Sequence, residues 1–274
     1  MASFQPPLTS GNTRVKEARK LARRSFRTAS GLFLADGPKA VEGALGIAGC
    51  VVEIFATVAA SEQYAGLGTS AESSGVRWTL VDDRALESLS DAINPAGLVA
   101  VCRRLDRSLT DLLATAAPRG DAAPMLAICA DVRDPGNAGT VIRTADAAGA
   151  AGVILAGNSV DMYNPKTVRA TVGSLFHLPL AVAADPAEAV LRARAAGFVV
   201  LAADGAGEQD LFDADRLLAQ PVAWLFGNEA WGLPEAIADL ADHRVRIPIM
   251  GSAESLNLAT AAAVCLYATA RARR

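Results

Sequence analysis

Three loop segments in the C-terminal half of the sequence carry the residues best suited to chemistry. They span residues 131–143, 225–234 and 247–257, and each follows an apolar run expected to be a buried strand. All three are rich in residues such as glycine, proline and asparagine, which let a backbone turn sharply and approach a ligand closely. Arg143 can grip a phosphate through paired hydrogen bonds, and Glu229 can accept a proton. Three such loops can converge on one site.

The amino-acid sequences and the spacing of these loops resemble the motifs of the SpoU (TrmH-type) RNA ribose 2′-O-methyltransferases of the SPOUT superfamily. The matching segments read Asp131-Val-Arg-Asp-Pro-Gly-Asn-Ala-Gly-Thr-Val-Ile-Arg143, Leu225-Phe-Gly-Asn-Glu-Ala-Trp-Gly-Leu-Pro234 and Ile247-Pro-Ile-Met-Gly-Ser-Ala-Glu-Ser-Leu-Asn257. The resemblance covers nearly the whole chain. The thiostrepton-resistance-like rRNA methyltransferases are the nearest subgroup, because they too carry an N-terminal RNA-binding domain of about this length.

The resemblance implies transfer of a methyl group from S-adenosylmethionine to a ribose 2′-hydroxyl of rRNA. Three alternatives stay open. The substrate can be a tRNA ribose, the modified atom can be a tRNA base nitrogen, or the chain can be a non-catalytic RNA-binding or ribosome-assembly factor that kept the fold. Loss of a motif residue such as Arg143, Glu229 or Asn257 would favour the last alternative, and all three are present.

The resemblance also assigns roles to individual residues. Because a guanidinium is hard to deprotonate, Arg143 is expected to orient the RNA and not to act as a general base. Glu229 has three possible roles: accepting the leaving proton, bracing Arg143 or ordering its loop. Ser255 and Asn257 can also cap the last helix. The side-chain chemistry is assigned to Arg143, Asn137, Glu229, Ser255 and Asn257, and the backbone contacts to the cofactor are assigned to Gly227, Ile247, Met250 and Leu256.

The elements that must position these loops alternate between apolar strands and helices from residue 125 onward. This pattern predicts an α/β fold with a parallel sheet covered on both faces, which binds ligands outside the carboxyl ends of its strands. The pattern alone favours an open Rossmann-like sheet, whereas the resemblance implies that the final segment is threaded into a deep trefoil knot. The expected strands are 125–130, 152–156, 178–183, 198–203, 222–226 and 244–249.

A dinucleotide site is not expected in this sheet. No Gly-x-Gly-x-x-Gly follows the first strand, and the weaker candidate, Asp204-Gly-Ala-Gly207, is followed by the acidic residues Glu208 and Asp210. Acidic side chains repel a pyrophosphate.

Length and composition predict two domains, because 274 residues with 51% apolar content can form two ordinary cores. The resemblance implies that residues 1–107 form a small α/β RNA-binding domain similar to a ribosomal protein. Residues 108–123 are expected to be a linker that can hold a short helix, and residues 124–274 to be the methyltransferase domain. By resemblance, the Ala-rich helix 256–274 and the helix of the first motif form a homodimer.

The first helix concentrates positive charge, although the whole chain has a net charge of -3. Seven cations and one anion give residues 11–27 a charge of +6, which leaves -9 for the remainder. Asn12 can cap a helix that starts at Thr13, and a row of cations along it can follow an RNA backbone. The alternative is a merely solvated helix face. The candidate RNA-binding residues are Lys16, Lys20, Arg23, Arg24 and Arg27.

Several classes of protein are not favoured. No apolar run is long enough to span a membrane and the N-terminus shows no secretory pattern, so a cytoplasmic protein without a membrane partner is expected. The four cysteines form no Cys-x-x-Cys pair, and the sequence has only two histidines. We therefore expect buried free thiols, with no disulfide, metal site or histidine catalysis.

Overall fold

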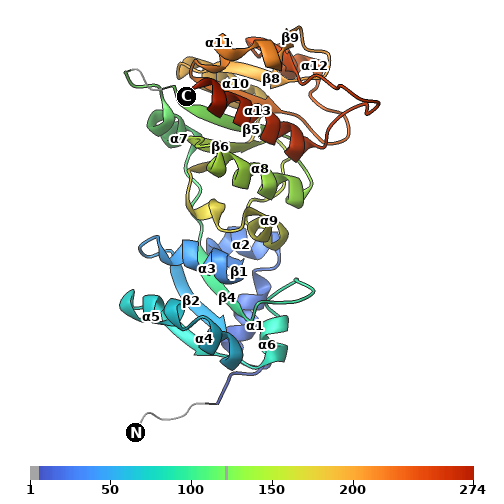
Figure 1. Ribbon diagram of the computed structural model, residues 1–274. Coiled ribbons are helices and arrows are strands. Elements are labelled where there is room, and N and C mark those ends of the chain that lie inside the picture. Colours follow the sequence, from blue (N-terminus) through green and yellow to red (C-terminus); the bar gives the residue numbers. More distant parts are fainter. Residues whose placement is uncertain (1–5, 121–122) are drawn as a thin grey trace. The chain divides into compact units, whose positions relative to one another are not determined.

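The computed structural model describes residues 6–120 and 123–274, which form two compact units (Figure 1). The first unit holds the chain up to Leu105 together with Tyr163–His177, and the second holds Asp106–Met162 and Leu178–Arg274. Residues 1–5, in the predicted first domain, and residues 121–122, in the predicted linker, lie outside the described residues.

A four-stranded mixed sheet forms the centre of the first unit. Its strand order is β1-β4-β2-β3, with β4 antiparallel to β1 and β2, and β2 parallel to β3. Val15 and Ala18 of α1, together with Leu21 at its C-terminal end, join the core of this sheet. The strands are β1 (Leu32–Asp36), β2 (Val51–Ala56), β3 (Arg77–Leu80) and β4 (Leu98–Arg103), and the helices that precede or connect them are α1 (Thr13–Lys20), α2 (Arg24–Ser30), α3 (Pro38–Leu45), α4 (Val58–Gln63), α5 (Ala65–Ser73) and α6 (Asp83–Glu87).

A later segment, Tyr163–His177, completes the first unit. It contains α9 (Pro165–Thr171) and a short 3-10 helix, Ser174–Phe176. The ring of Phe33 in β1 lies 4.5 Å from that of Tyr163 and 6.1 Å from that of Phe176, between ring centroids. The predicted methyltransferase domain, residues 124–274, includes this segment. The structure differs, because these aromatic side chains share the core of the first unit.

A seven-stranded sheet forms the centre of the second unit, in the order β7-β6-β5-β10-β8-β11-β9, and all its strand pairs are parallel. The predicted α/β fold with a parallel sheet is confirmed, whereas the knot stays a prediction. Strands predicted at 125–130, 152–156 and 222–226 have those bounds, and the others differ at one or both ends. The strands are β5 (Met125–Ala130), β6 (Gly152–Ala156), β7 (Leu180–Ala183), β8 (Val199–Ala203), β9 (Gln209–Asp210), β10 (Val222–Phe226) and β11 (His243–Arg246).

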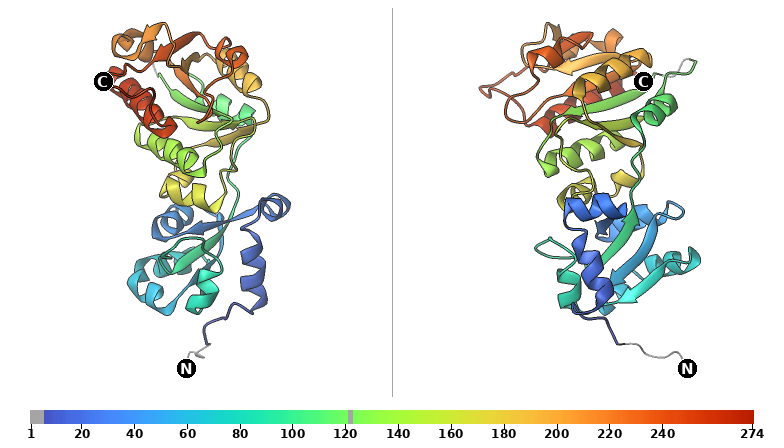
Figure 2. Two further views of the ribbon diagram at one scale, coloured as in Figure 1. Left: turned by 90° about the vertical axis from the view of Figure 1, so that its right-hand side faces the viewer. Right: turned by 180° about the vertical axis from the view of Figure 1, so that it is seen from behind.

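Helices cover both faces of this sheet, and on one face α13 lies beside α8 (Figure 2). There the indole Nε1 of Trp224 in β10 donates a hydrogen bond of 2.9 Å to Thr269 Oγ1 in α13. The other face carries α7 and α10. The helices are α7 (Leu109–Ala116), α8 (Pro135–Ala147), α10 (Pro186–Ala195), α11 (Asp215–Leu218), α12 (Glu235–Ala238) and α13 (Leu258–Ala272), with a 3-10 helix at Leu211–Asp213.

Helix α7 changes the interpretation of the predicted linker, residues 108–123. Its apolar residues Leu109, Leu112, Leu113 and Ala116 are all buried in the core of the second unit. Their spacing of three, one and three residues puts them on one helix face. Leu109–Ala116 therefore packs against the sheet of the second unit, which begins at Asp106.

The four cysteines are buried free thiols, as predicted. Burial raises the pKa of the Cys129 thiol to about 12, which keeps it protonated at neutral pH. Among the described residues, no three His, Cys, Asp or Glu side chains are grouped so that they could hold a metal ion. Within the same part of the chain, every helix is too short or too polar to cross a bilayer.

Candidate functional site

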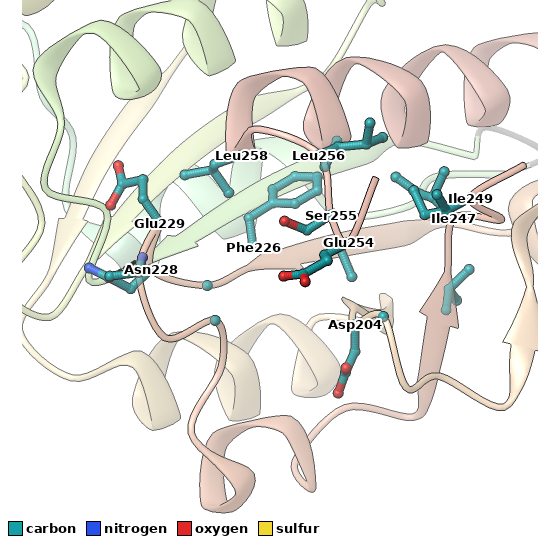
Figure 3. A pocket seen from close by; sticks show the side chains of 17 residues that line it. Asp204, Phe226, Asn228, Glu229, Ile247, Ile249, Glu254, Ser255, Leu256 and Leu258 are labelled. Atoms are coloured by element: carbon teal, nitrogen blue, oxygen red, sulfur yellow. Dashed lines mark hydrogen bonds between the residues drawn. The ribbon is translucent and has the colours of Figure 1, made fainter. Parts of the chain in front are cut away.

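A cavity of about 340 Å³ lies at the carboxyl ends of β8, β10 and β11 (Figure 3). The loop after each strand and the segment leading into α13 form its wall. The side chains of Asn228 and Glu229 lie at one end, and those of Ile247 and Ile249 at the other. This is where a parallel α/β sheet is expected to bind its ligand. The lining residues are Ala203, Asp204, Gly205, Phe226, Gly227, Asn228, Glu229, Ala230, Gly232, Val245, Ile247, Ile249, Glu254, Ser255, Leu256, Leu258 and Ala261.

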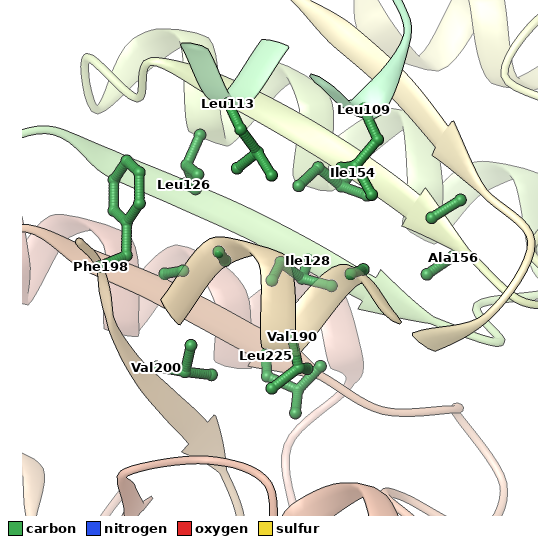
Figure 4. Close-up of a cluster of buried hydrophobic side chains, with 14 of the residues drawn as sticks. Leu109, Leu113, Leu126, Ile128, Ile154, Ala156, Val190, Phe198, Val200 and Leu225 are labelled. Carbon is green, nitrogen blue, oxygen red and sulfur yellow. The ribbon is translucent and has the colours of Figure 1, made fainter. Parts of the chain in front are cut away.

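The strands that carry these loops are fixed by a buried core on the opposite side of the sheet from α13 (Figure 4). Ile128 of β5, Val200 of β8 and Leu225 of β10 pack there with Val190 of α10. Because protein interiors are close-packed, such a core fixes the strand ends to which the loops are attached.

The loop after β10 folds back on itself immediately beyond the strand. The backbone N–H of Asn228 donates to Gly232 O, and the N–H of Gly232 donates to Asn228 O, both at 2.9 Å. The buried Asn228 side chain donates to Asp131 O at 2.7 Å and accepts from Ala230 N at 2.8 Å. A Cβ on Gly227 would lie 2.3 Å from the carbonyl carbon of Gly232. Only glycine therefore fits at position 227.

Glu229 joins the loop after β10 to the loop after β5. Its Oε2 accepts from Arg133 N at 3.1 Å, and its Oε1 accepts from Asp134 N at 3.0 Å and from Asn137 Nδ2 at 3.3 Å. No hydrogen bond or ion pair links it to Arg143 among the described residues. Of the three roles left open by the sequence, these contacts support the ordering of the first loop.

Asn257 connects the third loop to the same cluster. Its Oδ1 caps α13 by accepting from Ala259 N at 2.9 Å and Thr260 N at 3.3 Å, while its Nδ2 donates to Asn137 Oδ1 at 3.1 Å. Asn257 therefore caps a helix and orients a neighbouring site residue at once. The side chains of Asn257, Asn137 and Glu229 form a hydrogen-bonded chain that unites the three predicted loops.

The structure brings most of the predicted site residues together. Gly227, Ile247, Ser255 and Leu256 line the cavity. Met250 does not line it and is 89% exposed. Arg143 is exposed on α8 and also lies outside the cavity lining. The guanidinium is thus open to a ligand at the surface but is not part of the cavity wall.

The prediction of one continuous basic helix in the first unit is wrong. The Asn12 cap is confirmed, since its side chain accepts from Arg14 N, but α1 ends at Lys20 and α2 begins at Arg24. Arg27 is only 3% exposed and donates to the carbonyl oxygens of Leu21 and Ala22, both at 2.9 Å. Its guanidinium donates hydrogen bonds to backbone carbonyls at the turn between the helices. Because Arg27 is buried there, it is no longer a candidate RNA contact.

The other four candidate RNA contacts are exposed: Lys16, Lys20, Arg23 and Arg24. Lys20 forms an ion pair of 2.7 Å with Glu17, one turn away. Solvent-exposed pairs of this kind are weak, so Lys20 can exchange Glu17 for a phosphate at little cost.

The loop after β8 is a part of the cavity that the sequence did not predict. Asp204 and Gly205 line the wall, although their segment resembles only a weak dinucleotide motif. The available signal was the position of a glycine-rich turn directly after a predicted strand at the same sheet edge. Glu254 was also missed. The ionisable side chains that line the cavity are Asp204, Glu229 and Glu254, all of them acidic.

The Glu229 bridge predicts a specific loss of stability. Glu229→Gln replaces one carboxylate oxygen by an amide NH₂, which cannot accept from a backbone N–H. We expect the free energy of unfolding in urea to fall by about 1 kcal/mol. Glu254→Gln is the matched control, because Glu254 lines the same cavity without forming a hydrogen bond to the described residues. Equal effects of the two substitutions would contradict a stabilising bridge.

Comparisons with known proteins agree with this geometry. Residues 124–267 match the SpoU rRNA Methylase family, and residues 12–100 match the MRM3-like substrate binding domain. A 23S rRNA (guanosine(2553)-2'-O)-methyltransferase of Bacillus subtilis is 32% identical over 93% of this chain and 95% of its own. A 23S rRNA (uridine(2479)-2'-O)-methyltransferase of Streptomyces viridochromogenes is 47% identical over 51% of this chain and 50% of its own.

A solved structure shows the same architecture. The crystal structure of an AdoMet-bound rRNA methyltransferase from Sinorhizobium meliloti has a TM-score of 0.82 and 34% identity, and the match covers 97% of each chain. The predicted resemblance to the SpoU family is thus confirmed, and the structural match extends over 97% of the chain. The protein belongs to the SpoU rRNA methylase family.

Proposed function

We propose that this protein transfers the methyl group of S-adenosylmethionine to a ribose 2′-hydroxyl of 23S rRNA. The observation that carries the proposal is the cavity at the carboxyl ends of β8, β10 and β11, whose charged lining is acidic throughout. S-adenosylmethionine has a positive sulfonium and a positive ammonium group, so an acidic wall attracts it. The same wall repels the phosphates of NAD or ATP.

The size and apolar surface of the cavity also fit this ligand. Its volume of about 340 Å³ lies within the range of small-molecule sites, about 300–1,000 Å³. Phe226, Ile247, Ile249, Leu256 and Leu258 supply apolar lining that suits an adenosine. Such sites combine an apolar wall with a few polar groups that fix the ligand's orientation.

The protein's own contribution to the reaction is mainly positioning. Bound S-adenosylmethionine supplies an electrophilic methyl carbon on a positively charged sulfur. The hydrogen-bonded chain of Asn257, Asn137 and Glu229 holds the three loops in one arrangement. Glu229 already accepts three hydrogen bonds, so we assign it to loop positioning. Arg143 binds a phosphate of the RNA and orients the ribose 2′-hydroxyl toward the methyl carbon. Such alignment can supply a large part of the rate enhancement.

The first unit is proposed to select the RNA. Lys16, Arg23 and Arg24 are exposed there, and cations of this kind add salt-dependent, sequence-blind affinity for a phosphate backbone. The two relatives are named for a guanosine and a uridine. We therefore propose the ribose reaction without choosing a base. We further propose that the enzyme acts in the cytoplasm, because its proposed substrate is ribosomal.

We also propose that the protein acts as a homodimer. Helix α13 is rich in alanine, which permits close helix approach, and Tyr267 on this helix is 52% exposed. A second copy packed along α13 would cover that ring.

The test is the transfer of labelled methyl from S-adenosylmethionine to an unmethylated 23S rRNA transcript. Because a 2′-O-methyl group blocks alkaline cleavage of the next linkage, we expect one alkali-resistant site, which also identifies the nucleotide. Incorporation into tRNA alone would favour the tRNA alternative. Cofactor binding without any RNA product would contradict the proposed substrate, and the absence of both would favour a non-catalytic RNA-binding factor.

A further inference from the structure

Trp231 presents an open aromatic face beside the cavity. Its neighbours Ala230 and Gly232 both line the cavity, whereas Trp231 does not and is 55% exposed. Indole rings stabilise folded proteins mainly when they are buried. The exposure of this ring therefore calls for an explanation other than core packing.

The ring is paired with a cation from another loop. The guanidinium carbon of Arg133 lies 5.4 Å from the Trp231 ring centroid, within the range of a cation–π contact. Arg133 is exposed, and its guanidinium has no carboxylate partner in the described part of the chain. Its backbone N–H donates to Glu229, so Arg133 is fixed at one end. A positive charge thus remains available next to the indole.

The loop that carries Trp231 is already ordered. Paired backbone hydrogen bonds join Asn228 and Gly232, which flank Trp231 in the loop. The backbone N–H of Ala230 also donates to the Asn228 side chain. A preorganised loop loses little conformational freedom when a ligand binds. The backbone that carries the ring is therefore held in place before a ligand binds.

We propose that Trp231 and Arg133 form a stacking platform for an unstacked base of the RNA strand that carries the target ribose. The inference rests on the proposed function, since the ribose must reach the methyl carbon at the mouth of the cavity. Its own base or the adjacent base then comes within reach of Trp231. Every base has a π-face, so stacking positions the strand without reading its sequence.

The charge at the platform favours RNA as the occupant. The unpaired guanidinium of Arg133 attracts a phosphate, and aromatic rings beside arginines are a common means of binding unpaired nucleotides. A second copy of the chain would instead have to cover Arg133 with a carboxylate or leave its charge buried and unpaired, which is costly.

The test compares Trp231→Ala, Trp231→Phe and the control Phe212→Ala in the methyl-transfer assay with 23S rRNA transcript. Phe212 is an exposed aromatic residue, 60% accessible, outside the cavity lining. We expect Trp231→Ala to raise KM for RNA about tenfold to a hundredfold, the range given by loss of one stacked base. Trp231→Phe and Phe212→Ala should stay within about threefold of wild type. The affinity for S-adenosylmethionine should not change in any variant.

Tryptophan fluorescence gives a second measurement, which would not change on RNA binding if Trp231 had a purely structural role. A single-stranded RNA oligonucleotide should quench the emission of Trp231, and Trp231→Phe should lose that change while keeping RNA affinity. An unchanged KM for Trp231→Ala, an equal loss in Trp231→Phe, or sedimentation showing that Trp231→Ala dissociates a dimer would each overturn the stacking platform. If wild-type protein transfers no methyl group, the proposed function fails, and the quenching experiment still decides whether Trp231 binds a base.

Discussion

Replacement of Gly227 by alanine is expected to weaken S-adenosylmethionine binding by about 100-fold or more. The added Cβ would lie 2.3 Å from the Gly232 carbonyl carbon and 2.4 Å from its oxygen. Both are backbone atoms, so no side-chain rotation relieves the clash. The loop must open, and it carries Asn228 and Glu229, which hold the first loop in place. Displacements of about 1 Å in such sites can lower a reaction rate by about two orders of magnitude, and we expect the loss of cofactor affinity to be of similar size.

Gly251→Ala is the control for this substitution. Gly251 lies in the third loop, and a Cβ built there meets no atom within 4 Å. Isothermal titration calorimetry with S-adenosylmethionine should give this variant an affinity within about twofold of wild type, since nothing has to move. Circular dichroism checks that both variants are folded. A Gly227→Ala protein that binds the cofactor normally would show that the loop does not shape the site.

Arg143→Ala is expected to lower the single-turnover rate of methyl transfer by about 100-fold while leaving S-adenosylmethionine affinity unchanged. The separation of the two effects follows from the structure, because Arg143 is exposed on α8 and does not line the cavity. Loss of an orienting group affects the alignment of the acceptor hydroxyl, and alignment alone can account for a change of this size. Equal losses of cofactor affinity and rate would instead mean that Arg143 shapes the cavity.

Two further variants define the role of Arg143. Arg143→Lys keeps the charge but cannot form the paired hydrogen bonds of a guanidinium, so it should recover only part of the rate. Its pH–rate profile should match that of wild type, because neither side chain acts as the base. Arg216→Ala removes an exposed arginine from α11 and should retain full activity. A new pH dependence in Arg143→Lys would contradict the orienting role.

The loops of the site could be predicted from sequence because their chemistry is local. Glycine, proline and asparagine mark the turns, and apolar runs mark the strands before them. The contacts inside the site could not be predicted in this way. Glu229 and Asn137 are 92 residues apart in the sequence, and Asn137 and Asn257 are 120 residues apart. These hydrogen bonds therefore form only after the sheet has brought the loops together.

The break between α1 and α2 shows a different limit. No glycine or proline occurs between Lys20 and Arg24, and the local sequence is compatible with a continuous helix. The turn is held by the Arg27 guanidinium, which donates to two backbone carbonyls. A cation that satisfies a helix end looks the same in the sequence as a cation that binds phosphate. Only its burial in the folded unit distinguishes the two.

The position of Tyr163–His177 in the first unit has a consequence for the order in which the protein can fold. Phe33 is fully buried, and two of the rings that pack on it, Tyr163 and Phe176, are synthesised long after the rest of that unit. During translation, the N-terminal unit must wait for the ribosome to pass His177 before its core is complete. A fragment ending near Leu105 would leave Phe33 without these two rings, so an isolated RNA-binding unit has to be expressed with the later segment joined to it.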